Sequence, residues 1–595
     1  MKLTKFFILT VFVWLGSSCT LDLREDPNAV QPNQALPSLI LNSMQRNLAG
    51  LFNTASSNGM IATRLMNSGG NNYANIWNPQ SFDGTWSTAY ANILLDGKQL
   101  IELADANGLA RHAGMARVIS AYTLLLLVDS FGDVPYSQAL QGSDEFNPGV
   151  DNMADVYNEA IALLDKAKTD LTTPTVALGG YLNATAPAIS DLYYANNYGN
   201  WVRLANSLKL KVYLNLRLTD PTAATAGINA VIADAGGLIS TTAQNFTFRY
   251  GISQSDPDSR HPRFNANYLA GGGNYMSNYL IWQMFHGYDA TQNGQPGDPR
   301  IRFYFYRQVS TNNSDPNNIR CVTALSAPPH YPFSTGTAII YNSKAGVPPG
   351  ISTNPAHPAY FSSSGLPRTF CYPTDRGYWG RDHVDNQGIP PDNFLRSAWG
   401  AYPSGGRFDA NVNTSVNANV GMRGAGMQPI MMRSFVQFML AEAALYLGTT
   451  GTARTYYQNG IQASFDDVRA FVAGGAEATT VNTFYPAATY TTDVTNYITA
   501  ALAAYDAQVG NDNIMNYIAR EYWIALYCNG VEAFNLYRRT GLPTGMQPAL
   551  NDDPGAFPRS FYYPANFATR NSSVTQKSDL TGRIFWDTNT SNLDF

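Results

Sequence analysis

Two stretches near the start of the chain carry apolar side chains at helical spacing. Within residues 82–103 they recur every three or four positions, which places them on one face of a helix. Residues 113–127 continue as a second helix. After it, Gly132 offers a left-handed cap and Pro135 prevents continuation. This pattern predicts a helical hairpin.

The same pattern recurs later in the chain. It predicts further helices at residues 152–168, 200–218, 431–447, 452–465 and 513–527. Gly448 and Gly451 turn the chain between the third and fourth of these helices, so that pair is similar to a tetratricopeptide hairpin. Helical flanks on both sides of the chain's middle are therefore expected.

The middle, from about residue 240 to residue 428, has a different character. Gly, Pro, Asn and aromatic residues crowd together there, as in residues 271–275, 298–300 and 389–392, without a helical or alternating period. The segment is too aromatic for disorder. A long ordered insert within a helical scaffold is usually functional, so we expect it to carry a binding site.

The first residues are typical of an export signal. Lys2 and Lys5 precede an apolar run from residue 6 to residue 15, and small residues lead to Cys19. This order predicts a lipobox, with cleavage before Cys19 and lipidation of its thiol; ordinary secretion with cleavage nearby is the alternative. Residues 1–18 would be the signal, 19–34 a lipidated tether, and 35–595 one domain. No later stretch is expected to be long and apolar enough to cross a membrane.

Composition narrows the ligand class. Only 14% of the 595 residues are charged, 12% are aromatic and the net charge is −5, without a dense basic run. Nucleic acid therefore has no electrostatic support as a partner.

Of the other cysteines, Cys321 and Cys371 can pair in an oxidising compartment, while Cys528 lies in a helical pattern and is expected to be a buried thiol.

Catalytic motifs are missing from the sequence. It has no phosphate loop, no His-Glu-x-x-His, no Cys-x-x-Cys and no Gly-x-Ser-x-Gly. The densest polar cluster is Arg381-Asp382-His383-Val384-Asp385. It could hold a general acid or a metal ion, but we favour a structural loop network because no second carboxylate can be assigned by spacing.

A neutral sugar suits the composition better, because its C–H face stacks on aromatic rings while Asn, Asp or Arg binds its hydroxyls. The predicted ligand-binding residues are Asn72, Tyr73, Trp77, Tyr275, Trp282, Tyr378 and Trp379. Asn71, Tyr279, His286, Trp399 and Tyr402 lie beside them in three sequence groups. Any single aromatic among them is more often a core residue. Trp77 is expected to be exposed because Asn residues and Pro79 surround it.

Several strings, in this order, resemble the SusD/RagB family of nutrient-binding outer-membrane lipoproteins, in the branch called SusD-like family 2. They are Cys19, residues 25–28, 129–136, 298–300, 378–383, 402–409, 441–443 and 532–541. The resemblance implies an all-α fold with four tetratricopeptide-like hairpins and an irregular ligand-binding half. It also implies surface exposure, no cofactor, no enzymatic activity and a SusC-like TonB-dependent transporter as partner. Oligosaccharide is the expected ligand, with peptide binding, or less readily glycan hydrolysis, as alternatives.

Overall fold

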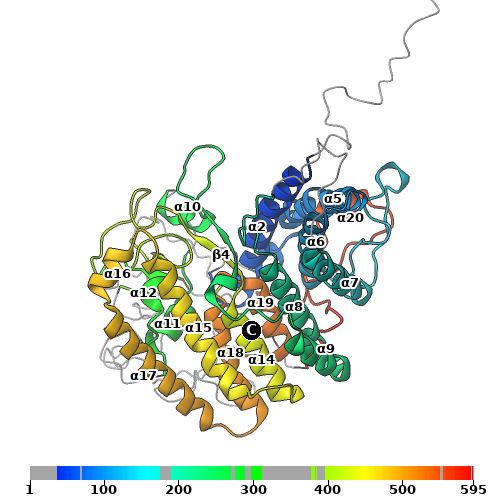
Figure 1. Cartoon of the computed structure of the whole chain (residues 1–595). Helices are drawn as coiled ribbons and strands as arrows, with labels where there is room; N and C mark the ends of the chain where they lie inside the picture. The colour runs from blue at the N-terminus through cyan, green and yellow to red at the C-terminus, as the bar shows by residue number, and fades with distance from the viewer. Residues whose placement is uncertain are drawn as a thin grey trace, which may run out of the picture.

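Helices carry most of this chain, and the strands are few and short (Figure 1). The computed structural model describes residues 36–67, 70, 72–173, 189–269, 275–288, 297–310, 377–381, 383–384, 395–547, 549, 554–590 and 593. The expected all-α class is confirmed. Cys19, Asn71, Cys321, Cys371, Asp382 and Asp385 lie outside the described residues, as does the His286 side chain.

The predicted first hairpin is confirmed. Its first arm combines α4 (Asp83–Ala89), a π-helical turn η3 (Tyr90–Leu94) and α5 (Leu95–Ala106), and its second arm is α6 (Ala110–Phe131). Gly132 ends α6 with a φ of 78°. Before them runs α2 (Pro37–Ala62), which begins with a proline at its first turn.

Helix α6 lies at the centre of this flank. By length and composition it is the one helix in the described part of the chain that could cross a membrane, so the expectation that no such stretch follows the signal is wrong. However, 94% of its most apolar window is buried inside the molecule. Helix α6 packs against α2, α5 and α7. For this reason its buried small and apolar residues extend towards the start of the helix.

Three more helices complete the first flank. They are α7 (Met153–Thr172), α8 (Tyr198–Asn215), extended by η5 (Leu216–Leu218), and α9 (Pro221–Ala233). Asn152, Asn197 and Asp220 cap these helices by accepting hydrogen bonds from backbone N–H groups of the first turn. The predictions for 152–168 and 200–218 are confirmed.

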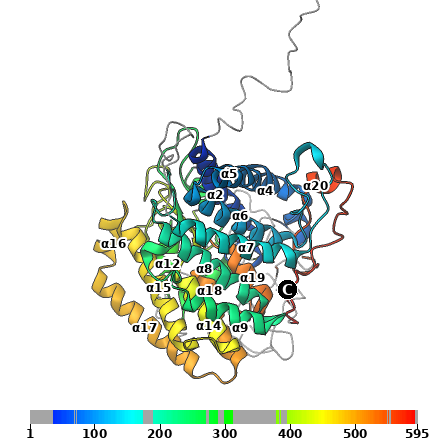
Figure 2. The same cartoon turned by 45° about the vertical axis from the view of Figure 1, so that its right-hand side comes forward.

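The second flank is also an array of helices. They are α14 (Arg433–Leu447), α15 (Ala453–Ala473), α16 (Ala478–Phe484), α17 (Ala487–Asp506), α18 (Asn511–Ala525) and α19 (Gly530–Thr540). The three predictions here are confirmed, although α15 extends beyond residue 465. Figures 1 and 2 show α16 and α17 on the outer edge of the molecule, alongside α15.

Short elements organise the described parts of the middle. Strands β1 (Phe246–Arg249) and β4 (Met427–Met431) pair antiparallel, so the two ends of the middle segment lie side by side. A second pair joins β2 (Phe305–Tyr306) to β3 (Ala398–Trp399). The middle also contains η6 (Thr242–Gln244), α10 (Pro262–Tyr268), α11 (Asn278–His286) and α12 (Ile301–Tyr304). Short elements outside the middle are α3 (Tyr73–Ile76), η2 (Pro79–Phe82), η4 (Gly142–Asp144) and α20 (Ala565–Arg570).

Buried ion pairs tie the two flanks together. The Lys211 ammonium on α8 lies 2.6 Å from an Asp129 carboxylate oxygen at the end of α6 and 3.2 Å from Glu532 on α19. All three side chains are almost completely buried, so each charge depends on its partners. Cys528 is a free, buried thiol as predicted.

Candidate ligand-binding site

The first predicted group, residues 72–78, folds as two short turns. The Asn72 side chain accepts a hydrogen bond from Asn75 N at 2.8 Å, and Asn78 accepts one from Ser81 N at 3.2 Å. These caps place Tyr73 and Trp77 on the same side of α3, with their ring centroids 5.5 Å apart. The two asparagine side chains therefore cap the turns that they begin, and Asn72 is half-buried.

The expectation that Trp77 is exposed is wrong. Its side chain is 0% exposed and also packs on Phe561, at a centroid distance of 5.5 Å. Residues from the far end of the chain cover the indole, and Asn residues in sequence do not prevent this. Trp77 is a core residue.

Tyr73 belongs to a buried polar network. Its hydroxyl lies 3.0 Å from His383 Nε2 and accepts a hydrogen bond from Arg64 at 3.4 Å. Gln547 accepts bonds from both neighbours, through its carbonyl from Arg64 Nε at 2.9 Å and through its side chain from His383 N at 3.0 Å. Burial and the Arg64 charge hold the pKa of His383 well below its ordinary value, so the imidazole is neutral. The structural interpretation of the 381–385 cluster is confirmed for His383.

The second and third predicted groups meet in space. Arg381 N donates to the Met276 carbonyl and Asn278 N donates to the Arg381 carbonyl, each at 2.9 Å. This pairing brings Arg381 against Tyr275, with the guanidinium carbon 4.0 Å from the ring centroid. Arg396 contacts the same ring, also at 4.0 Å. Tyr275 is thus held by two cationic planar groups.

The other predicted aromatics lie inside the fold, so the expectation that they offer accessible platforms is wrong. Trp282 is 5% exposed, Tyr378 0% and Trp379 3%. Tyr378 donates to an Asp409 carboxylate oxygen at 2.7 Å, and Trp379 Nε1 donates to the Leu395 carbonyl at 3.2 Å. Tyr279, Trp399 and Tyr402 are equally buried. Tyr279 packs on Trp523 of α18, with ring centroids 5.6 Å apart, and Trp399 packs on Tyr527, with ring centroids 5.0 Å apart.

Among the predicted residues, Asn72 is half-buried and Tyr275 is 9% exposed, more than Trp282, Tyr378 or Trp379. Arg381 and His383 connect them, since Arg381 packs on Tyr275 and His383 bonds Tyr73. Half-buried Arg381 holds its guanidinium beside the Tyr275 ring, and guanidinium N–H groups suit hydroxyl or carbonyl oxygens of a ligand. Within the described residues, no three His, Cys, Asp or Glu side chains gather to hold a metal ion.

Sequence reasoning missed Arg64, Arg396 and Gln547. Arg396 and Gln547 lie far along the chain from the residues that they contact, whereas Arg64 lies nine residues before Tyr73 in a segment with no motif. The one usable sequence signal was the polar string that contains Arg381 and His383, because Arg381 contacts Tyr275 and His383 contacts Tyr73.

Two sequence-family profiles match the chain. The profile described as "Starch-binding associating with outer membrane" (SusD-like) matches residues 27–325, half of the chain, and "Susd and RagB outer membrane lipoprotein" matches residues 406–586. No curated protein matches significantly.

Solved structures share the fold over nearly the whole chain. A SusD homologue from Bacteroides fragilis is 20% identical, with a TM-score of 0.61, covering 93% of this chain and 99% of that one. A chitin-binding SusD homologue from Flavobacterium johnsoniae is 17% identical, with a TM-score of 0.58 and coverages of 93% and 99%. A third, from Bacteroides uniformis, is 18% identical, with a TM-score of 0.59 and coverages of 92% and 99%.

Proposed function

This chain belongs to the SusD-like family, and from that premise we propose that it is a cell-surface lipoprotein which binds oligosaccharide and delivers it to a SusC-like TonB-dependent transporter. The family match across both flanks carries the proposal. Its starch-binding description and the chitin-binding homologue with the same fold support a glycan as the ligand class.

Lipid on Cys19 would hold the protein on the outer membrane. Two or three acyl chains anchor a protein essentially permanently, whereas one does so reversibly. The tether of residues 20–34 would then connect the anchor to α2, which begins at Pro37.

The ligand site is proposed at the junction of Asn72, Tyr275 and Arg381. Its support is the convergence of three separate sequence groups at one place in the fold, through the contacts of Arg381 and His383. The half-buried Arg381 guanidinium would bind sugar hydroxyls beside the Tyr275 ring. Binding is expected without turnover of the ligand.

A binding screen tests this proposal. The protein lacking residues 1–19 is titrated by calorimetry with a panel of oligosaccharides and a panel of peptides, and each glycan is then checked by chromatography for cleavage. We expect saturable binding of at least one oligosaccharide class, recovered intact. Binding of peptides alone would favour the peptide-binding alternative, and cleavage products would favour a hydrolase.

Arg381→Ala locates the site. It should weaken glycan binding by about 1–3 kcal/mol, as expected for loss of one anchor. The matched control is Arg454→Ala, which removes an exposed arginine paired with Asp506 on the second flank and should leave binding unchanged. Equal affinities of the two variants would place the site elsewhere.

A further inference from the structure

A hollow of about 310 Å³ lies between α15 and α17, apart from every residue of the proposed main site. Its size falls at the lower end of the range of small-molecule sites, about 300–1,000 Å³. The nine lining residues are Gln462, Asp466, Arg469, Ala470, Ala473, Tyr490, Thr491, Val494 and Thr495.

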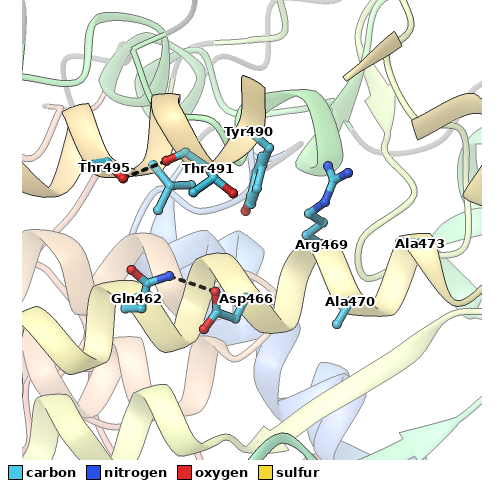
Figure 3. A pocket seen from close by; sticks show the side chains of 9 residues that line it. Gln462, Asp466, Arg469, Ala470, Ala473, Tyr490, Thr491 and Thr495 are labelled. Carbon is cyan, nitrogen blue, oxygen red and sulfur yellow. Dashed lines mark hydrogen bonds between the residues drawn. The ribbon is translucent and has the colours of Figure 1, made fainter. Parts of the chain in front are cut away.

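Polar side chains face each other across this hollow. Figure 3 shows Gln462 and Asp466, one turn apart on α15, opposite Thr491 and Thr495 on α17. Gln462 Nε2 donates to an Asp466 carboxylate oxygen at 2.8 Å, which fixes the two relative to each other. Thr495 donates its hydroxyl proton to the Thr491 carbonyl at 2.8 Å, so its oxygen can still accept a hydrogen bond.

One wall of the hollow is aromatic and fixed. Tyr490 is 4% exposed and donates its hydroxyl proton to the Phe465 carbonyl at 2.7 Å. Arg469 lies 4.9 Å from the Tyr490 ring centroid and donates to the Tyr485 carbonyl at 3.0 Å. These bonds hold the wall in place without a ligand, which reduces the ordering cost of binding.

The charges at the hollow nearly balance. Asp466 is half-exposed and lies 3.4 Å from Arg433, and Arg469 lies one turn further along α15. The short side chains of Ala470 and Ala473, together with Val494, add an apolar part to the lining. A neutral ligand with several hydroxyl groups and a C–H face matches this combination.

We infer that the hollow between α15 and α17 is a second sugar site, which takes a single monosaccharide unit, free or at the end of a chain. Asp466, Gln462 and the two threonines bind the hydroxyls, and Tyr490 with Val494 contacts the ring. The inference goes beyond the proposed function, because it concerns a separate site in the helical flank and does not require the junction at Tyr275.

Saturation-transfer NMR with glucose, galactose, mannose and N-acetylglucosamine tests this site. At least one of these sugars should bind the wild-type protein saturably. Thr491→Tyr fills the hollow and should lower the affinity for that sugar at least about tenfold, as for loss of an anchoring contact. The matched control, Thr492→Tyr, introduces the same ring at the next, exposed position of α17, outside the lining, and should bind like wild type.

Asp466→Asn keeps the size of the side chain and removes its charge. This variant should also bind the sugar more weakly than the wild type. Its affinity decides the outcome if circular dichroism shows that Thr491→Tyr is misfolded. Lack of binding of all four sugars to the wild type, or equal affinity of Thr491→Tyr and Thr492→Tyr, would overturn the second site. Oligosaccharide bound equally by wild type and Thr491→Tyr would at the same time leave the proposed main function standing.

Discussion

Trp77 is enclosed by Tyr73 on one side and Phe561 on another. Removing the indole by Trp77→Ala leaves a cavity in this aromatic cluster, and we expect a loss of about 3–5 kcal/mol in the free energy of unfolding. Urea denaturation measures it. Phe146→Ala is the control, because Phe146 is 75% exposed and its loss should change stability by less than about 0.5 kcal/mol. Similar stabilities of the two variants would contradict the core assignment.

The proposed lipid anchor would depend on Cys19. Cys19→Ala removes the thiol that would be acylated, so the protein should remain unlipidated and soluble in the periplasm. Acyl labelling and membrane fractionation of the expressed variant check this. Continued labelling, or an unchanged membrane fraction, would disprove lipidation at this position.

The burial of Tyr73 and Trp77 has a physical reason that combines local caps with one distant contact. Asn72 and Asn78 signal a polar surface in composition, yet their side chains cap short turns whose other face is the core. An aromatic residue one turn away from such a cap can point inward or outward, and the choice depends on Phe561, almost 500 residues later. Sequence could find the segment but not the side on which its rings lie.

Helices α2 and α19 cross at two glycines. A Cβ built on Gly530 would lie 2.0 Å from the Ser56 carbonyl oxygen, so Gly530→Ala forces the helices apart. We expect a loss of about 1–3 kcal/mol, as for overpacking. Gly50→Ala, in α2 with no atom near the new methyl group, should instead stabilise by up to about 1 kcal/mol. Thermal and urea unfolding of both variants test this, and a neutral Gly530→Ala would refute the tight crossing.

Glu442 on α14 joins α19 to the end of α8. Its carboxylate lies 2.7 Å from Arg539 Nε and 2.7 Å from Arg217 Nε. Burial alone would raise its pKa, but the charges of Arg539 and Arg217 hold the pKa of Glu442 below its ordinary value. A lowered folded-state pKa contributes stability above the unfolded-state pKa, about 4.3, and that stability is lost as pH falls through the folded-state pKa.

Glu442→Gln should therefore destabilise the protein most at neutral pH, by about 3–5 kcal/mol, because two buried arginines lose their counter-charge. The difference in unfolding free energy between wild type and variant should shrink as pH falls below about 4.3. Urea denaturation across this pH range measures it, with Asp506→Asn at an exposed pair as control. A difference that stays constant with pH would exclude this role.

Helical periodicity predicted the helices whose apolar faces are regular, from 82–103 to 513–527. It did not predict α2, which contains Gly50 and Gly59, or α17, which is rich in β-branched threonine. Both have weak helix propensity, and both form because neighbouring helices cover their apolar faces. Strand β1 was missed for a similar reason, since its partner lies about 180 residues away.

At the scale of the whole molecule, the two flanks present broad helical surfaces, and the described parts of the middle consist of short elements joined by loops. We expect the flanks, residues 82–218 and 430–540, to face the transporter barrel, while residues 70–80 and the middle contact the ligand. Crosslinking of the protein to a SusC-like barrel, followed by mass spectrometry, tests this division. Crosslinks chiefly within residues 270–410, with none on the flank helices, would reverse it.

The proposed site could be anticipated only in part. Asn72, Tyr275 and Arg381 were singled out by composition, whereas their convergence depends on backbone pairing between residues 276–278 and 381 across about 100 residues. The hollow on α15 and α17 was not anticipated, because its lining residues are ordinary in sequence and α17 itself was missed.

Helix α2 is completed by residues at the end of α18 and just after it. Ser56 donates to the Cys528 carbonyl at 2.9 Å, and Trp523 Nε1 donates to the Thr63 carbonyl at 2.8 Å. A ribosome makes α2 more than 450 residues before these partners exist, so α2 cannot finish folding until residues 523–528 have been made. Such distant contacts also slow folding once the chain is complete. The exposed apolar face of α2 must therefore be protected from aggregation during export, and a chain that is truncated before α18 would be a target for proteases.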